Sequence, residues 1–348
     1  MTTNRTVIVV GAGASSECKF PTGLELKTEI ARLLDLKFTG FEMASGDALI
    51  WEAIRIQVQN EGTRDFNPYL TAGRRIRDAM PQAISIDNFI DCHAGSKHLE
   101  ICGKLGIARA ILQSERNSLL FVDWRGRDRH PIYSTLADTW YTAFMQLLTQ
   151  NCRSHQISER LSRITFVVFN YDRCVEQFLF HGIRNYYGLD EAAAAEVLQG
   201  LRVLHPYGSV GSLPWQRNQN SVEFGGDISA KRLHELAAGI KTFTERTDPA
   251  SSEIKEVRES LRNATMLLFL GFAYHRQNLD LLRPDAPHQD PTAVRYLGTA
   301  AGMSESDSAL VKEDLVTLAS AKPEHIVLRN DLKCGSFFRE YWRSLSLG

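Results

Sequence analysis

Residues 7–15 read Val-Ile-Val-Val-Gly-Ala-Gly-Ala-Ser, four branched apolar residues followed directly by a glycine-rich turn. A short apolar run of this kind suits a central parallel strand, because helices cover both of its faces. Gly11 and Gly13 let the backbone turn sharply and approach a pyrophosphate, to which the following helix offers its free N–H groups. The stretch therefore predicts a nucleotide-binding α/β domain. By itself it fits dehydrogenases, flavoproteins, methyltransferases and other nucleotide binders, or only a tight turn.

Composition and charge set broad limits on the class of protein. The 348 residues include 40 basic and 41 acidic side chains, which give a net charge of -1. This balance offers no global electrostatic case for nucleic acid or a membrane surface, so we predict direct binding to neither. The only apolar run near the N-terminus is too short for a signal peptide, and no stretch approaches the length that spans a bilayer. We therefore expect a cytoplasmic protein.

The six cysteines are scattered along the chain, and no two of them form a C-x-x-C pair. This spacing argues against a zinc ribbon and against a redox dithiol, so we expect no bound metal.

Further apolar runs predict the remaining strands of the sheet. They lie at 164–169, 203–204, 266–270, 294–297 and 325–328, and helical stretches separate them. Residues 46–160 instead show mainly helical periodicity. We therefore predict an α/β fold, a Rossmann-like doubly wound parallel sheet, formed by residues 1–36 and 160–348. Residues 37–159 are expected to form an all-helical insertion subdomain.

Small, polar or titratable residues follow the predicted strands. Asn170 and Asp172 come after one strand, His205 follows another, and Gly271 and Gly298 follow two more. Ligands of open parallel sheets bind beyond the carboxyl ends of the strands, so we expect these residues to share one site.

Hydride transfer does not fit this pattern. A dinucleotide-dependent dehydrogenase needs a second strand that ends in an acidic residue about 20 residues after the glycine turn. Here the chain enters helical sequence instead, and no partner site for hydride transfer is evident. The glycine turn therefore predicts nucleotide binding of another kind.

Five short motifs occur in a specific order. They are GAGAS (11–15), PTG (21–23), FNYD (169–172), LHPYGS (204–209) and LGFAYHRQNL (270–279). In this order the chain resembles the sirtuin-like family, and most closely the bacterial sirtuin-like NAD hydrolases of antiphage defence. The resemblance covers roughly 1–35 and 160–335, and the segment SIDNFI at 85–90 is similar to a helical segment of those proteins.

The resemblance implies that Asn170 and His205 are catalytic and that NAD is the substrate. It also implies that NAD is bound by Gly11, Ala12, Gly13, Ala14, Ser15, Pro21, Thr22, Asp172, Gly208, Ser209, Gly271, Phe272 and Gly298. Cleavage of the nicotinamide–ribose bond releases a neutral leaving group, so it needs a held ribose and an oriented nucleophile more than acid assistance. An amide such as that of Asn170 both donates and accepts, and an imidazole such as that of His205 takes a proton near neutral pH.

Plainer interpretations of the same residues stay open. An asparagine after a strand is often a turn residue, a single histidine is often structural, and Asp172 suits the cap of the following helix. Pro206 and Tyr207 stand between His205 and Gly208, where many relatives have histidine directly before Gly-Ser, which puts the position of the imidazole or of Tyr207 in question.

Protein-deacylating sirtuins carry a zinc ribbon of paired cysteines, which this chain lacks. Water is then the natural acceptor, and the expected products are nicotinamide and ADP-ribose. There are two alternatives. One is a regulatory or assembly subunit that binds NAD or ADP-ribose without turnover, and the other is an ADP-ribosyltransferase. The resemblance further implies a homo-oligomer or ring and a partner subunit, such as a HerA-like ATPase or an Argonaute-type protein.

Overall fold

A six-stranded parallel sheet lies at the centre of the computed structural model, which describes residues 5–40, 42–123, 130–219, 221–241, 252–284, 294–319, 322–345 and 347. Its strands are β1 (Thr6–Val10), β4 (Ile164–Val168), β5 (Arg202–Leu204), β6 (Met266–Leu270), β7 (Arg295–Thr299) and β8 (Ile326–Arg329). They lie in the order β5-β4-β1-β6-β7-β8, and every neighbouring pair is parallel. Renumbered within this sheet, the order is 3-2-1-4-5-6, that of doubly wound dinucleotide-binding sheets. The predicted parallel α/β sheet is confirmed.

Strand β1 lies in the middle of the sheet and is buried along its whole length. Val7 pairs with Thr165 of β4 on one side and with Leu267 of β6 on the other. Every residue of β4 and β6 is buried as well. Both faces of the central strands are therefore covered, which explains why these segments are almost entirely apolar.

Alternate residues of β1 enter two different cores. Val7 and Val9 belong to one core, together with residues of α13 (Ser252–Arg262), α14 (Arg276–Leu282) and α15 (Glu305–Ala319). Ile8 and Val10 belong to the other core. That second core takes its helical residues from α7 (Trp140–Thr149), α8 (Ile157–Leu161), α9 (Cys174–Tyr187), α10 (Glu191–Leu198) and α16 (Cys334–Glu340). The period of two along the strand thus distributes its side chains between the two faces.

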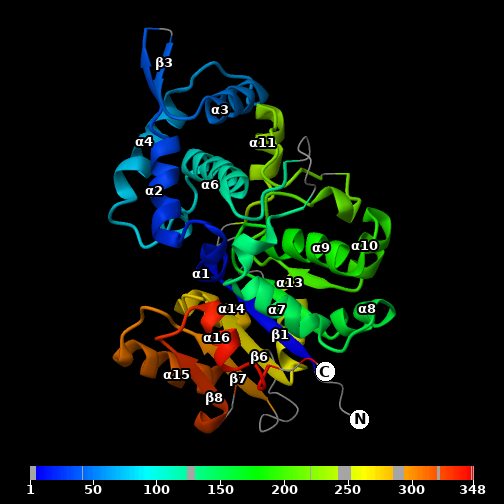
Figure 1. Cartoon of the computed structure of the whole chain (residues 1–348). Coiled ribbons are helices and arrows are strands. Elements are labelled where there is room, and N and C mark those ends of the chain that lie inside the picture. The colour runs from blue at the N-terminus through cyan, green and yellow to red at the C-terminus, as the bar shows by residue number, and fades with distance from the viewer. Residues whose placement is uncertain are drawn as a thin grey trace.

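The remaining long helices gather beyond the carboxyl ends of the central strands (Figure 1). They are α2 (Gly23–Leu33), α3 (Ala48–Asn60), α4 (Asn67–Ala79), α5 (Ile86–Cys92), α6 (Lys97–Asn117) and α11 (Ala230–Ala237). Helix α6 contacts α2, α4 and α11, and α11 also packs on α3. The cluster therefore combines residues from both sides of the predicted boundaries at 36 and 160. Conversely, α7 falls within residues 37–159 and α8 begins there, but both pack on the sheet.

A β-hairpin corrects the prediction that residues 37–159 are all-helical. Strands β2 (Lys37–Thr39) and β3 (Glu42–Ser45) form an antiparallel pair, seen at the top of Figure 1. Gly40 has a φ of +64°, which glycine adopts at little cost, and the Phe38 ring lies 4.8 Å from that of Trp51 in α3. The strands are too short to show a clear alternation of apolar and polar residues, so the helical signals around them dominate the sequence pattern.

Short elements complete the described chain. They are α1 (Ala12–Ser15) and the 3₁₀-helices η1 (Ser16–Cys18), η2 (Tyr133–Leu136), η3 (Ser154–Gln156), η4 (Pro214–Gln216) and η5 (Pro323–His325).

A buried ion pair joins the helical cluster to the sheet. The guanidinium of Arg173, just before α9, donates two hydrogen bonds to Glu115 of α6, at 2.9 and 2.6 Å. The two side chains are 1% and 0% exposed, so each charge depends on the other for compensation. Arg173 also donates to the backbone oxygens of Ser212, Val222 and Glu223. One side chain thereby fixes α6, α9 and the segment 212–223 relative to one another.

Candidate functional site at the strand ends

The glycine turn after β1 packs directly on the turn after β6. Gly11 N donates to Leu270 O at 2.9 Å, and Gly13 N donates to Gly271 O at 3.0 Å. A Cβ atom on Gly11 would lie 2.5 Å from the oxygen of Gly271, and one on Gly271 would lie 2.0 Å from the nitrogen of Ala14. This contact alone accounts for glycine at positions 11, 13 and 271. It lies between β1 and β6, where the strand order reverses and where ligands of such sheets bind.

Three predicted site residues from the ends of β1 and β4 form one hydrogen-bonded chain. Asn170 Nδ2 donates to Ser15 Oγ at 3.1 Å, and Ser15 Oγ donates to Asp172 Oδ2 at 2.9 Å. The other carboxylate oxygen of Asp172 accepts from the backbone N of Cys174, the first residue of α9. Burial raises the pKa of Asp172, although these hydrogen bonds oppose it. Ser15 and Asp172 are buried and hold Asn170, which stays partly exposed.

His205, at the end of β5, joins this group through two contacts. Its Nε2 lies 2.8 Å from Glu176 Oε1, and its Nδ1 lies 3.4 Å from the backbone oxygen of Asn170. Because an ionised carboxylate only accepts, Nε2 carries a proton in this arrangement. Burial alone would lower the pKa of His205, but the charge and hydrogen bond of Glu176 outweigh it, and the net pKa is raised. The imidazole is thus oriented by Glu176, with the longer contact at Nδ1.

Glu176 was not predicted from the sequence. It lies in the first turn of α9, four residues after Asp172, and its side chain is 5% exposed. Its Oε2 is buried without a hydrogen-bond partner among the residues that the structure describes. The available signal was an acidic residue in the first turn of a helix that starts at a strand end. That position also suits a residue that simply favours the helix N-terminus.

Other predicted ligand residues lie around this group without entering its hydrogen bonds. Thr22 opens α2, where its backbone N and hydroxyl both donate to Glu25 at 2.7 and 2.8 Å. Gly208 has a φ of +68° and closes a turn onto His205 O at 2.8 Å. Half-buried positions at the strand ends are Ala12, Gly13, Pro21, Thr22, Asn170, His205, Gly208, Ser209 and Gly271, whereas Gly11, Ala14, Ser15 and Asp172 are buried.

Phe272 and Gly298 lie in the packed interior, which argues against direct contact of either with a ligand. Phe272 is 4% exposed, and its ring packs on those of Phe169 and Tyr274. Gly298 lies within β7 rather than after it, and a Cβ there would meet the Tyr274 hydroxyl at 2.5 Å. The apolar run at 294–297 ends before the strand does, so the sequence pattern set the strand end two residues too early.

Aromatic side chains close the group on the side of the helical cluster. Tyr207, two residues after His205, is buried, packs on Phe169 and donates its hydroxyl hydrogen bond to Asn278. Tyr171 donates to Asp87, in the first turn of α5. The sequence segment at 85–90 thus lies against the strand ends.

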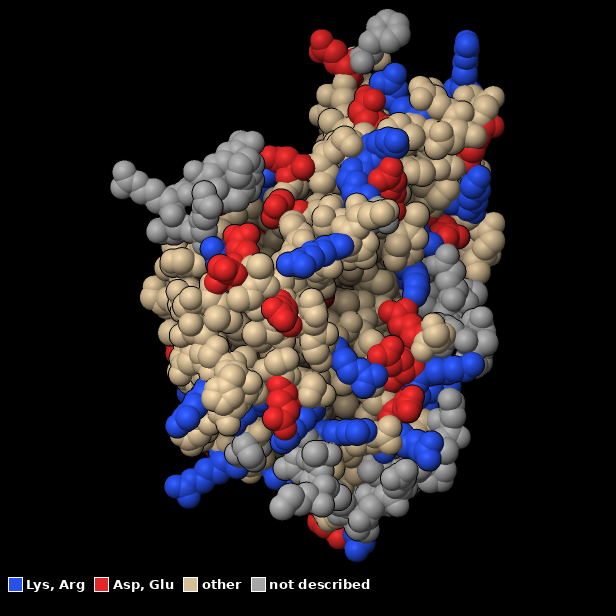
Figure 2. Space-filling view, turned by 90° about the vertical axis from the view of Figure 1, so that its right-hand side faces the viewer, with Lys and Arg blue, Asp and Glu red and all other residues tan. Residues whose placement is uncertain are grey.

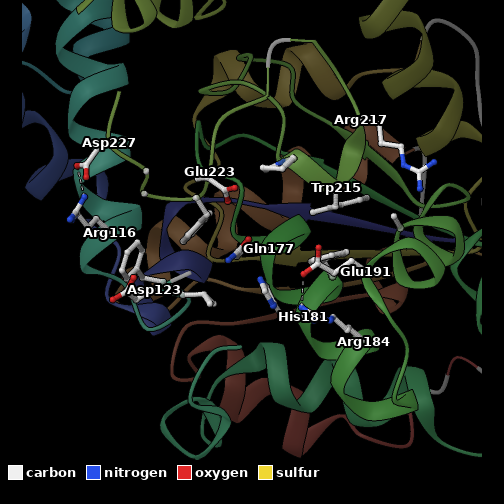
Figure 3. Close-up of a pocket in the computed structure, with 18 of the residues that line it drawn as sticks. Arg116, Asp123, Gln177, His181, Arg184, Glu191, Trp215, Arg217, Glu223 and Asp227 are labelled. Atoms are coloured by element: carbon white, nitrogen blue, oxygen red, sulfur yellow. Dashed lines mark hydrogen bonds and ion pairs between the residues drawn. The ribbon is translucent and has the colours of Figure 1, made fainter. Parts of the chain in front are cut away.

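The structure also has a cavity of about 570 Å³, and it lies apart from this group. It is bordered by α9, α10 and the segments 121–123 and 214–227, and none of the predicted site residues lines it (Figure 3). The side of the molecule that carries α8 and α10 is viewed directly in Figure 2, where acidic and basic side chains are intermixed. The strand-end group is therefore defined by its own hydrogen bonds, and the cavity is a separate feature.

No group of three or more His, Cys, Asp or Glu side chains suited to a metal ion occurs in the described part of the chain. Within the same residues, no helix has both the length and the apolar character needed to cross a membrane. No protein-family model matches the chain, and a search of curated proteins likewise found no match.

Proposed function

We propose that the protein hydrolyses NAD⁺ to nicotinamide and ADP-ribose at the carboxyl ends of β1, β4 and β5. The observation that carries the proposal is the contact of His205 with the Glu176 carboxylate and with the backbone oxygen of Asn170, at 2.8 and 3.4 Å. An imidazole oriented by a carboxylate, beside a half-exposed amide, is an arrangement that abstracts a proton from water or a sugar hydroxyl. The sheet order and the motif order described above support a dinucleotide as the substrate.

The proposed reaction breaks the bond between the nicotinamide nitrogen and ribose C1′, and a water oxygen forms the new bond to C1′. Nicotinamide leaves as a neutral molecule, and His205 Nδ1 takes the proton of the attacking water and passes it to solvent. Glu176 holds the proton on Nε2, so in the neutral ring the lone pair is on Nδ1; the Asn170 backbone oxygen beside it cannot donate a hydrogen bond, and Nδ1 is the nitrogen that takes a proton. Asn170, held by Ser15, would hydrogen-bond a ribose hydroxyl through its amide. His205 and Asn170 are thus the catalytic residues, and Glu176 is a positioning residue.

The test is to incubate the purified full chain with NAD⁺, alone and with any protein that co-purifies with it, and to quantify nicotinamide and ADP-ribose. We expect His205→Ala and Asn170→Ala each to lower turnover by about 10² or more while leaving the fold intact. His155→Ala is the matched control, because that histidine is exposed in η3. Wild-type turnover by His205→Ala would contradict the proposed mechanism, and a chain that releases no nicotinamide would contradict the activity.

A second candidate is binding of NAD or ADP-ribose without turnover. It is favoured by the confinement of His205, whose side chain is only 12% exposed and whose two ring nitrogens both face protein oxygens. Calorimetric titration with ADP-ribose, paired with the product assay, separates the two functions. Binding with no product at any concentration supports the second, and transfer of labelled ADP-ribose to a macromolecule identifies a transferase.

A further inference from the structure

A second ligand site lies in the cavity between α9, α10 and the segment 214–227, away from the strand-end group. Its volume of about 570 Å³ is in the range of pockets that hold small molecules. We infer that this cavity binds a small organic cation with an aromatic ring. The inference is independent of NAD cleavage, because the walls of the cavity include no residue of the proposed reaction.

A pair of stacked aromatic rings forms part of the cavity wall. Trp215 in η4 lies on Phe180 of α9, with ring centroids 5.3 Å apart and planes within 3° of parallel. Phe180 is buried, whereas Trp215 stays partly exposed. An indole ring attracts both aromatic rings and cations, and it attracts cations more strongly than other aromatic side chains do. These rings therefore favour a planar ligand, and a positively charged one in particular.

Carboxylates outnumber arginines in the wall of the cavity, which includes Asp123, Glu191, Glu223 and Asp227 but only Arg116, Arg184 and Arg217. Arg116 pairs with Asp227 at 2.5 Å, and Arg184 pairs with Glu191 at 3.2 Å. Glu223 makes no ion pair with any residue that the structure describes, and Figure 3 shows it on the same side of the cavity as Trp215. A cation next to Trp215 would therefore meet a carboxylate that has no ion-pair partner among these residues.

The surroundings of Glu223 agree with this assignment. Partial burial raises the pKa of its carboxyl, Arg173 opposes that change, and the charge of Glu191 adds to it. A carboxylate that lies near a second acid gains from an incoming cation.

An anionic ligand fits the cavity less well. Two of its three arginines are already paired with acids, as described above. The third, Arg217, is exposed and lies at the far end from Arg116 (Figure 3). Glu223 is exposed as well, so the preference for a cation comes from the excess of carboxylates over arginines in the cavity wall and from the indole ring of Trp215.

Three probes of the same size test the inference on the full chain. They are benzylamine, a cation at neutral pH, benzyl alcohol, which is neutral, and benzoate, an anion, each titrated by calorimetry and by ligand-observed NMR. We expect benzylamine to bind about tenfold more tightly than benzyl alcohol, and benzoate to bind most weakly. Equal or tighter binding of benzoate would overturn the charge assignment, and no binding of any probe would overturn the site.

Two variants locate the binding. Glu223→Gln should reduce the preference for benzylamine over benzyl alcohol to about twofold, and Trp215→Leu should weaken both probes. Glu196→Gln is the matched control, because Glu196 is exposed on α10 and does not line the cavity. Circular dichroism shows whether each variant is folded. An unchanged preference in folded Glu223→Gln would overturn the role of that carboxylate.

Discussion

The Oε1 atom of Glu176 lies 2.8 Å from Nε2 of His205, and both side chains are largely withdrawn from solvent. One residue comes from the first turn of α9 and the other from the end of β5, and 29 positions separate them in the chain. The carboxylate fixes which ring nitrogen carries the proton and stabilises the imidazolium form. This pair sets the protonation state of the imidazole at the strand ends.

Replacement of Glu176 by glutamine should lower the pKa of His205. The variant loses the negative charge that opposes burial, so the pKa should fall from above 6.5 to below it. Titration of the His205 ring by NMR measures this directly, without reference to activity. Under the proposed mechanism the base must be neutral, so the acid limb of kcat/KM should move to lower pH in the variant. An unchanged ring titration would show that Glu176 does not control His205.

The same pair predicts how stability depends on pH. Because the folded-state pKa of His205 is raised, its contribution is fully present below about pH 6.5 and is lost as the pH rises through the folded-state pKa. The free energy of unfolding of the wild type should therefore decrease over that interval, relative to Glu176→Gln. Urea denaturation at several pH values provides the measurement, and parallel profiles for the two proteins would contradict the prediction.

Single substitution of Arg173 by methionine should cost about 3 to 5 kcal/mol of stability, because Glu115 keeps a buried charge without compensation. The double variant Glu115→Leu with Arg173→Met should be less destabilised than the sum of the single variants, by about 2 kcal/mol. It should not return to wild type, since three backbone oxygens lose their donor. A double-mutant cycle by chemical denaturation tests this, and additive costs would contradict the coupling.

Two glycine substitutions distinguish the loss of stability caused by steric contact from the loss caused by a positive φ alone. Gly271 and Gly188 have φ of +54° and +64°, but an added Cβ meets backbone atoms only at Gly271. We expect Gly271→Ala to cost about 2 to 5 kcal/mol, because backbone must move, and Gly188→Ala about 1 to 2 kcal/mol. Thermal denaturation of both variants provides the comparison. Equal losses of stability would show that the turns after β1 and β6 can move apart at little cost in free energy.

A single carboxylate caps two helices on the face of the sheet opposite α13. Glu17 accepts from the backbone N of Trp140 at the start of α7, at 2.7 Å, and from that of Gly335 at the start of α16, at 2.8 Å. Glu17→Ala should therefore cost about 2 kcal/mol, roughly the sum of two caps. The control is Glu25→Ala in the exposed first turn of α2, for which about 0.5 kcal/mol is expected. A cost for Glu17→Ala no larger than that of Glu25→Ala would contradict the double cap.

The strands were predictable because their signal is local. Residues 7–10 and 266–270 are apolar at every position and residues 164–169 at all but Thr165, and such short runs are typical of strands covered on both faces. Asn170 and His205 each directly follow a predicted strand, so they were predictable as neighbours at one edge of the sheet. The hairpin at Lys37–Ser45 was not predictable, because its strands are short and Phe38 is held by a contact with Trp51.

Local residue patterns were sufficient to predict the parallel sheet and the glycine turn, since each depends on residues within a few positions of one another. The contacts that these residues make became visible only in the folded chain. It pairs Glu176 with His205, packs Gly11 on a turn some 260 residues further along the chain, and builds a cavity around Trp215. Such contacts join segments whose order in space is set by core packing, so no local pattern encodes them.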